Sequence, residues 1–282
     1  MHEEKGLDDL ILDAVSTAIT SDDDEFPFRH HLGASLLGSD CELQLFFSFR
    51  WVKDVQHESR IERIFSKGRR EEIVMLDHLE QAGLTLTREK EGQQIRAPMP
   101  PHLGGSTDAI LHVPASHVHL YGHYMPIEVK THKQETFNRV KKKPLFESMP
   151  QHWCQANIYA VQFGMSHFMY YAKNKNNEEY HLKIYEANAT VAKINIERGS
   201  RIVVANIRES LGRTTAKHKC NMCDYKEICK MRLPAEAVNC RSCKHAFPMA
   251  EGTWLCNKIG VEIAKFDEIK QAARCGAWES IV

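Results

Sequence analysis

The apolar strand predicted at residues 124–131, YMPIEVKT, carries two opposite charges on one face. Side chains alternate along a strand, so Glu128 and Lys130 share one face while Ile127 and Val129 share the other. The apolar face suits burial in a core. The charged face brings an acid and a base to one point, where both can reach a single ligand.

The elements around this strand alternate between helical and extended patterns. A helix is predicted over 58–83, because Ile61, Ile64, Ile73, Leu76 and Leu79 recur at helical spacing and Gly83 supplies a stop. Further helices are predicted at 33–51, 151–164 and 188–211, and further strands at 84–89, 105–113, 167–173 and 179–187. This order predicts an α/β fold with a central mixed sheet flanked by helices.

The first of these helices, in the segment 33–51, offers Ser39 or Asp40 as its N-cap, which would place Cys41 in the first turn. Residues 1–32 are acidic and weakly patterned, and we expect a lead-in to the folded chain. Their apolar stretch is short and has no basic flank, so neither a signal peptide nor a membrane span is predicted, and we expect a soluble, cytoplasmic protein.

The composition limits the kind of partner. Of 282 residues, 43% are hydrophobic, and Lys+Arg and Asp+Glu both number 37. This balance suits a globular protein and gives no global attraction to nucleic acid, so any such surface must be local. Seven of the nine cysteines lie from position 220 onward, several in C-x2-C pairs. In a chain that is neither small nor exported, this pattern favours metal ligation over disulfides.

A second acid, Asp108, lies in the predicted strand GSTDAILHV, and neighbouring strands could bring it to Glu128. Two carboxylates around a gap suit Mg²⁺ or Mn²⁺, which prefer oxygen ligands and keep positions open for water and phosphate. Beside them, Lys130 can orient a nucleophile and offset charge in the transition state. The chemistry indicated is phosphodiester hydrolysis.

The ordered pair GSTDAI and PIEVKT resembles the active-site hairpin of the PD-(D/E)xK nuclease superfamily, which has a restriction-endonuclease-like core. The resemblance implies that Asp108, Glu128 and Lys130 are catalytic and that the Val129 carbonyl is a further metal ligand. KGRREEIV resembles the Gly-x3-acid motif of RecB-like members, which implies Glu72 as a ligand in preference to the adjacent Glu71. QANIY resembles their Gln-x3-Tyr motif, and by that resemblance Gln155 and Tyr159 contact substrate or brace the lysine.

The cysteine triplet of KCNMCDYKEIC, together with one cysteine before the core, resembles the iron–sulfur nucleases of the RecB-like and CRISPR-associated RecB-like exonuclease group. The resemblance implies a [4Fe–4S] cluster held by Cys41, Cys220, Cys223 and Cys229. Four thiolates also suit Zn²⁺, and the residues alone leave both open.

A second cysteine set follows in the tail. Cys240, Cys243, Cys256 and Cys275 could form a four-thiolate zinc site, with His245 as an alternative fourth ligand. Three regions are therefore predicted: the lead-in at 1–32, a RecB-like nuclease core with an iron–sulfur cluster at 33–232, and a zinc-ribbon-like module at 233–282. Cys154, between Trp153 and Gln155, is predicted to be a buried packing residue.

A basic segment follows the charged strand and is read as a loop. It contains Lys133, Arg139, Lys141, Lys142 and Lys143, which could grip a phosphate backbone, and Phe137, which could stack on an unpaired base. The function implied is a metal-dependent DNA exonuclease acting on free or single-stranded ends in recombination, repair or a phage or CRISPR setting, with a possible partner protein. The alternative is a DNA-binding or adaptor subunit in which catalysis is minor.

Overall fold

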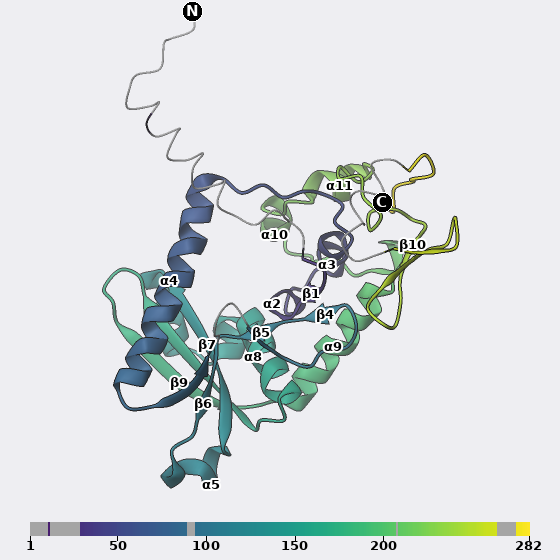
Figure 1. Ribbon diagram of the computed structural model, residues 1–282. Helices are drawn as coiled ribbons and strands as arrows, with labels where there is room; N and C mark the ends of the chain where they lie inside the picture. The colour runs from purple at the N-terminus through teal and green to yellow at the C-terminus, as the bar shows by residue number, and fades with distance from the viewer. Residues whose placement is uncertain (1–10, 12–28, 89–93, 207, 264–274) are drawn as a thin grey trace, which may run out of the picture.

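A five-stranded sheet forms the centre of the computed structural model, which describes residues 11, 29–88, 94–206, 208–263 and 275–282 (Figure 1). Its strand order is β2-β6-β7-β8-β9. The strands are β2 (Thr85–Arg88), β6 (Ala109–His112), β7 (Tyr124–His132), β8 (His167–Asn174) and β9 (Tyr180–Glu186). β7 pairs with β6 antiparallel and with β8 parallel, so the predicted mixed sheet is confirmed.

Helices cover both faces of this sheet, as predicted. On one face α4 (Ser59–Gln81) packs Met75, Leu76 and Leu79 against Ile127 and Val129 of β7. On the other lie α6 (Gln134–Lys142), α7 (Leu145–Ser148) and α8 (Pro150–Gln162) (Figure 1). The α4 chain turns at Gly83, whose φ of +87° belongs to the left-handed region that glycine tolerates best.

A second core lies beside the sheet. Its helices are α2 (Ala34–Leu37), α3 (Glu42–Phe49), α9 (Ala189–Val203), α10 (Lys217–Asn221) and α11 (Lys226–Met231). The tail adds a small antiparallel sheet of β10 (Ala246–Pro248), β11 (Trp254–Cys256) and β12 (Val261–Ile263). Trp254, Ile263 and Ile281 of the tail pack in one hydrophobic cluster with Phe46 and Phe49 of α3. The segment from 233 onward therefore shares its core with a helix from the beginning of the described chain.

The remaining described elements are short. They are β1 (Leu32–Gly33), β3 (Ile95–Arg96), β4 (Leu103–Gly104), β5 (Ser106–Thr107), α5 (Val118–Tyr121) and the 3₁₀ turns η1 (Ala115–His117) and η2 (Arg208–Ser210). β1 pairs parallel with β4, and this pairing ties the end of the predicted lead-in to the core. The rest of that lead-in, apart from residue 11 and residues 29–32, lies outside the described residues. No helix in the described part of the chain has the length and apolar character that crossing a membrane requires.

Several local predictions were wrong. Cys41, not Ser39 or Asp40, is the N-cap of α3. The Asp40 carboxylate instead accepts hydrogen bonds from Thr214 at 2.8 Å and Lys219 at 2.9 Å, so it is engaged away from the helix. The helix predicted over 188–211 ends at Val203.

The basic segment after β7 is also not a loop. It forms α6, an amphipathic helix whose apolar side faces the sheet. Phe137 is fully buried there, packed in the cluster that contains Phe168 and Tyr170, so it cannot stack on a base as we had expected. The basic segment is helical because a helix with one apolar stripe is stabilised when that stripe is buried against the sheet.

Candidate functional site

The strand predicted over 105–113 is interrupted at Asp108, and this break creates the site. β6 pairs with β7 from Ala109 onward, whereas β5 leaves the main sheet and pairs with β3. The hydroxyl of Thr107 fixes the break, because its Oγ1 lies 3.1 Å from the carbonyl oxygens of both Ala109 and Ile127. Beyond this point no strand among the described residues pairs with β7 on that side.

The Asp108 carboxylate takes the place of the missing strand. Its Oδ2 accepts a hydrogen bond of 2.7 Å from the backbone N–H of Val129. This bond holds the carboxylate against β7 at Val129, the residue between Glu128 and Lys130. Two acids from neighbouring strands thus meet at the place where the sheet splits.

Lys130 occupies the centre of this group. Its Nζ donates a hydrogen bond of 3.0 Å to the Val129 carbonyl and contacts the Glu128 carboxylate. The side chain of Glu128 is 2% exposed, and neither of its oxygens accepts a hydrogen bond of regular geometry. A positive charge therefore already lies between Glu128 and the Val129 carbonyl, two of the ligands that the family resemblance implies for a metal.

The electrostatics of the site show an excess of negative charge. Burial and the charges of Asp108 and Glu72 raise the pKa of Glu128 to about 7, although the Lys130 charge opposes them. Burial also raises the pKa of Asp108. The pKa of Lys130 is raised by Glu128, Asp108 and Glu72 although burial acts to lower it. Three acids surround one ammonium, and a divalent cation would balance the remaining charge.

The adjacent acids of α4 have different partners. Glu71 forms an ion pair of 2.6 Å with Lys173 of β8, which also contacts Glu178. Glu72 instead lies near enough to Glu128 and Lys130 for its charge to raise the pKa of both. The geometry therefore directs Glu72, the residue implied by the glycine spacing, toward the site.

Gln155 and Tyr159 lie on the face of α8 that approaches the site. The amide Nε2 of Gln155 is 3.5 Å from the Tyr159 hydroxyl, and burial together with the Glu128 charge raises the pKa of Tyr159. Both residues line a pocket of about 760 Å³ that also includes Arg29 and Arg96. Gly105 is required beside them, because a Cβ at that position would lie 2.6 Å from the Tyr159 hydroxyl oxygen.

A buried hydrogen-bonded network next to Lys130 was not predicted. The Tyr170 hydroxyl lies 2.8 Å from Nε2 of His132 and 2.8 Å from Nδ1 of His152. Burial and then the Lys130 charge lower the pKa values of His132 to about 4 and of His152 to about 3, so both rings are neutral. A signal was present in the sequence: His132 follows Lys130 on the same strand face, and His152 precedes Gln155 by one helical turn.

The basic residues of the segment 133–143 are exposed on α6. Lys133 is its N-cap, and Arg139, Lys141, Lys142 and Lys143 follow on the solvent side. Two of them are engaged by acids, since Lys141 contacts Glu179 and Lys143 lies 3.5 Å from Glu147. Lys142 has no carboxylate partner within the described ranges.

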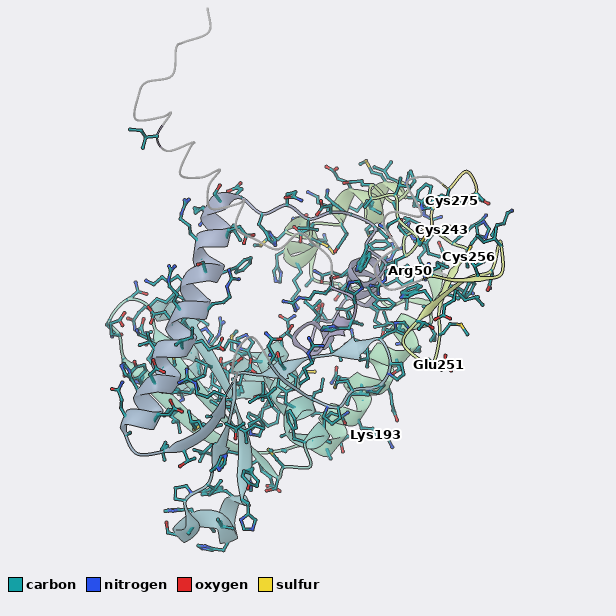
Figure 2. All side chains as sticks on the ribbon, viewed as in Figure 1. Arg50, Lys193, Cys243, Glu251, Cys256 and Cys275 are labelled. Atoms are coloured by element: carbon teal, nitrogen blue, oxygen red, sulfur yellow. The ribbon has the colours of Figure 1, made fainter. Side chains whose placement is uncertain are left out.

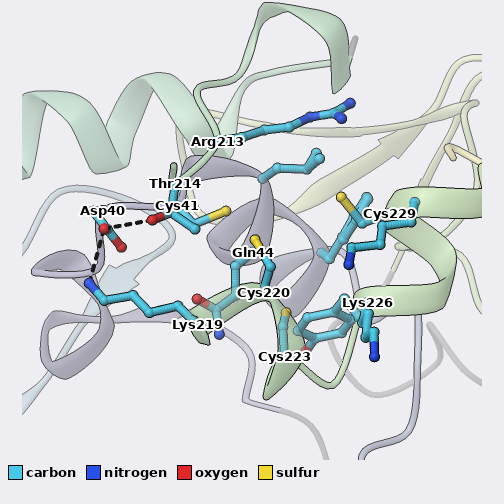
Figure 3. Close-up of a pocket in the computed structure, with 14 residues that line it drawn as sticks. Asp40, Cys41, Gln44, Arg213, Thr214, Lys219, Cys220, Cys223, Lys226 and Cys229 are labelled. Carbon is cyan, nitrogen blue, oxygen red and sulfur yellow. Dashed lines mark hydrogen bonds and ion pairs between the residues drawn. The ribbon is translucent and has the colours of Figure 1, made fainter. Parts of the chain in front are cut away.

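The first cysteine set meets around one pocket. Cys41 caps α3, Cys220 lies on α10, Cys229 lies on α11, and Cys223 lies in the turn between those two helices. All four line a pocket of about 190 Å³, and Figure 3 shows their sulfur atoms around it. All four are free thiols. The fold thus brings Cys41 to a triplet almost 180 residues further along the chain.

The second cysteine set lines another pocket, of about 30 Å³, which includes Cys240, Cys243, Cys256, Cys275 and His245. Cys154 lines neither pocket and is 3% exposed, so its predicted role as a packing residue is confirmed. Among the described side chains, no three His, Cys, Asp or Glu residues are close enough together to hold a metal ion as they stand.

Comparisons with known proteins give distant structural similarity. No family model matches the chain, and no curated protein matches it. The structure of a protein called SSO0001 aligns with a TM-score of 0.46 and 13% identity, over 80% of this chain and 97% of that one. The alkaline exonuclease LHK-Exo from Laribacter hongkongensis aligns with a TM-score of 0.44 and 13% identity, over 67% of this chain and 90% of that one.

The complex of LHK-Exo with dAMP aligns with a TM-score of 0.42 and 12% identity, over the same 67% and 90% of the two chains. Identities this low leave the site residues of this chain to be judged from its own geometry.

Proposed function

We propose that this protein is a metal-dependent deoxyribonuclease of the PD-(D/E)xK type that hydrolyses phosphodiester bonds. The observation that carries the proposal is the position of the Lys130 ammonium, which lies between the buried Glu128 carboxylate and the Val129 carbonyl beside Asp108. This arrangement of oxygen donors already accommodates a cation. Its unbalanced negative charge suits a divalent one.

The donor set fits Mg²⁺ or Mn²⁺. Both ions prefer carboxylate and carbonyl oxygens, and Asp108, Glu128, Glu72 and the Val129 carbonyl supply them. When bound, such an ion lowers the pKa of water and offsets charge on a phosphate. The Glu128 carboxyl group, whose pKa is raised to about 7, would release its proton to solvent near neutral pH when such an ion lies beside it.

Lys130 then has a separate task. With Glu128 and the Val129 carbonyl engaged as ligands, its ammonium can turn to the attacking water and the phosphate oxygens. There it would orient the nucleophile and stabilise negative charge that develops in the transition state. The neutral pair His132 and His152 would add no competing positive charge beside it.

DNA is the substrate we propose. Gln155 and Tyr159 supply an amide and a phenol at the edge of the site, in a pocket that also contains the guanidinium groups of Arg29 and Arg96. The exposed lysines and arginine of α6, which begins directly after the catalytic strand, would hold the phosphate backbone without reading sequence.

We infer finer features from the family resemblance. These are exonucleolytic cutting at free or single-stranded ends, membership of the RecB-like group, and action in recombination, repair or DNA-end processing in a phage or CRISPR context, with a partner protein. A [4Fe–4S] cluster at Cys41, Cys220, Cys223 and Cys229 belongs to the same proposal. A pocket of about 190 Å³ between four thiols supports a multi-atom group there, since a single water needs only about 10–15 Å³.

The test uses anaerobically purified full-length protein with end-labelled linear and closed circular DNA, each single- and double-stranded, in Mg²⁺ or Mn²⁺. Lys130→Ala should abolish metal-dependent cleavage, whereas Lys193→Ala, at an exposed lysine on α9, should retain it. Sparing of the circles would make the enzyme an exonuclease. If the wild-type protein binds DNA but leaves every substrate intact, the protein is an adaptor subunit and the nuclease proposal fails.

A further inference from the structure

The tail contains a second set of thiols that the nuclease proposal does not use. Cys240, Cys243, Cys256 and Cys275 all line one pocket, and Figure 2 shows the last three grouped at the edge of the molecule near Arg50. None of the four is in a disulfide within the described residues. Reduced cysteines gathered around one small pocket are typical of a metal site.

Three of the four begin tight turns. Backbone N–H groups of Cys243, Gly260 and Trp278 donate to the carbonyl oxygens of Cys240, Cys256 and Cys275, at 3.1, 2.8 and 3.3 Å respectively. A bridge between Cys243 and Ser280 then brings the end of the chain beside the first pair. The backbone itself therefore gathers the four positions, without any metal.

The charge around this pocket is unusual. Arg50, the C-cap residue of α3, is 1% exposed and donates a hydrogen bond of 2.6 Å to the carbonyl oxygen of Cys243. Its guanidinium forms an ion pair with no carboxylate in the described ranges. A buried cation is costly without a nearby anion.

A second guanidinium strengthens this pattern. Arg241, which lies between the first two cysteines in sequence, is fully buried among three aromatic rings. Its guanidinium carbon is 4.4 Å from the Phe49 ring centroid, 4.1 Å from that of Trp51 and 4.6 Å from that of Trp254. Four thiolates around Zn²⁺ carry a net charge of −2, which two guanidinium groups offset.

The volume of the pocket indicates the size of the group that it can hold. Its volume is about 30 Å³, against about 190 Å³ for the pocket around Cys41. A space of this size suits one ion rather than a cluster of several atoms, since one water occupies roughly 10–15 Å³ by the same measure.

His245 could replace Cys275 as the fourth ligand only through Nδ1, because its Nε2 lies 2.9 Å from the Glu279 carboxylate.

We propose that Cys240, Cys243, Cys256 and Cys275 bind one Zn²⁺ as thiolates, with buried Arg50 as the compensating charge. Binding converts four thiols to thiolates and releases four protons to solvent, with no redox change. The site goes beyond the nuclease proposal and does not depend on it.

The position of α3 gives this site a structural role. Cys41 lies at the N-terminal end of the helix, facing the first cysteine pocket, and Arg50 lies at its C-terminal end, against the second. The tail also donates two backbone N–H groups, of Glu236 and Ala237, to the Val52 carbonyl just beyond the helix. Zinc would therefore fasten the C-terminal segment to the helix that carries the first ligand of the other pocket.

The experiment measures zinc and iron separately in anaerobically purified full-length protein. The wild type should contain about one zinc ion per chain. Cys240→Ser and Cys256→Ser should lose the zinc and keep the iron, and Cys154→Ser, the matched control, should keep both. Zinc retained in both tail variants, or a wild-type protein without zinc, would overturn the proposal.

A second measurement does not depend on folded variants. Thiol alkylation of the wild type, read by peptide mapping, should leave the four tail cysteines protected until a zinc chelator is added. Replacement of zinc by Co²⁺ should give the sulfur-to-cobalt charge-transfer absorption of a tetrahedral thiolate site. Rapid alkylation of these four cysteines before chelation would contradict zinc binding.

Discussion

The two kinds of candidate site in this protein are built in opposite ways. Glu128 and Lys130 lie on β7 and Asp108 lies at the break before β6, and the register of the sheet with one hydrogen bond to Val129 places them. The two cysteine pockets are assembled from short helices, turns and a strand of distant segments around α3. The backbone ladder holds the first site, whereas the second kind depends on how distant segments pack.

This difference predicts how each site responds to damage. The charged group on β7 costs stability, because Glu128 is buried without a regular hydrogen bond. Its removal should harm chemistry while leaving the fold intact. The cysteine pockets join segments that are distant in the sequence, so loss of their ligands should destabilise the folded protein.

The largest expected effect is therefore on stability, at the first cysteine pocket. Cys220→Ser should remove the proposed cluster and lower the free energy of unfolding by several kcal/mol, since metal binding is coupled to folding. The measurement is iron content together with the thermal unfolding midpoint. Cys154→Ser should keep its iron. Equal loss of iron in both variants would mean that the loss is not specific to the cysteines of the pocket.

The second effect is on activity. Glu128→Gln should reduce cleavage by about 10²- to 10³-fold, because it removes a charged ligand from the reacting centre. Its unfolding midpoint should stay close to that of the wild type, since Asp108 and Glu72 remain to balance the Lys130 charge. Glu186→Gln, an exposed glutamate on β9, is the control. A strong fall in the midpoint of Glu128→Gln would place this residue with the structural ligands instead.

The third effect is the pH dependence of stability. The pKa of Glu128 is about 7 in the folded protein and 4.5 ordinarily, so the folded state binds more protons between these values. Its contribution to stability therefore falls as pH rises from 4.5 to 7, by about 3 kcal/mol at 1.36 kcal/mol per pKa unit.

His132 and His152 act in the opposite sense. Their pKa values are lowered to about 4 and about 3, so their contribution is lost as pH falls below 6.5. Urea unfolding of the wild type and of Glu128→Gln in magnesium-free buffer isolates the contribution of Glu128, because the histidines are common to both proteins. The difference between the free energies of unfolding of the two proteins should change with pH. Adding Mg²⁺ should abolish this pH dependence, because it acts on the wild type. A constant difference would mean that Glu128 is ionised throughout.

The smallest expected effect is on DNA affinity. Lys142→Ala on α6 should weaken binding modestly and reduce the slope of log affinity against log salt by about 0.9 for duplex DNA, the value for one lost phosphate contact. Lys193→Ala is the matched control, since this lysine is exposed on a different helix, α9. If the two variants have equal slopes, Lys142 of α6 does not contact a DNA phosphate.

Much of this architecture could be predicted from the order of patterns along the chain. The long amphipathic helix ending before Gly83, the strands at 84–89 and 124–131 and the mixed sheet all follow from apolar periodicity, which is a local property. The same alternation put Glu128 and Lys130 on one strand face. Periodicity failed for α6, because its apolar stripe is short and its last turn is basic, and only contact with the sheet shows Phe137 to be buried.

The sequence by itself determined which residues to propose for chemistry: two acids and a lysine near an apolar strand, and cysteines in pairs. Only the tertiary structure decided what surrounds them. The break at Asp108, the His132–Tyr170–His152 network, the ion pair of Glu71 with Lys173, and the buried Arg50 beside Cys243 all depend on contacts between distant segments. The physical reason is that side-chain type and periodicity are encoded locally, whereas burial, charge balance and pocket volume are properties of the packed chain.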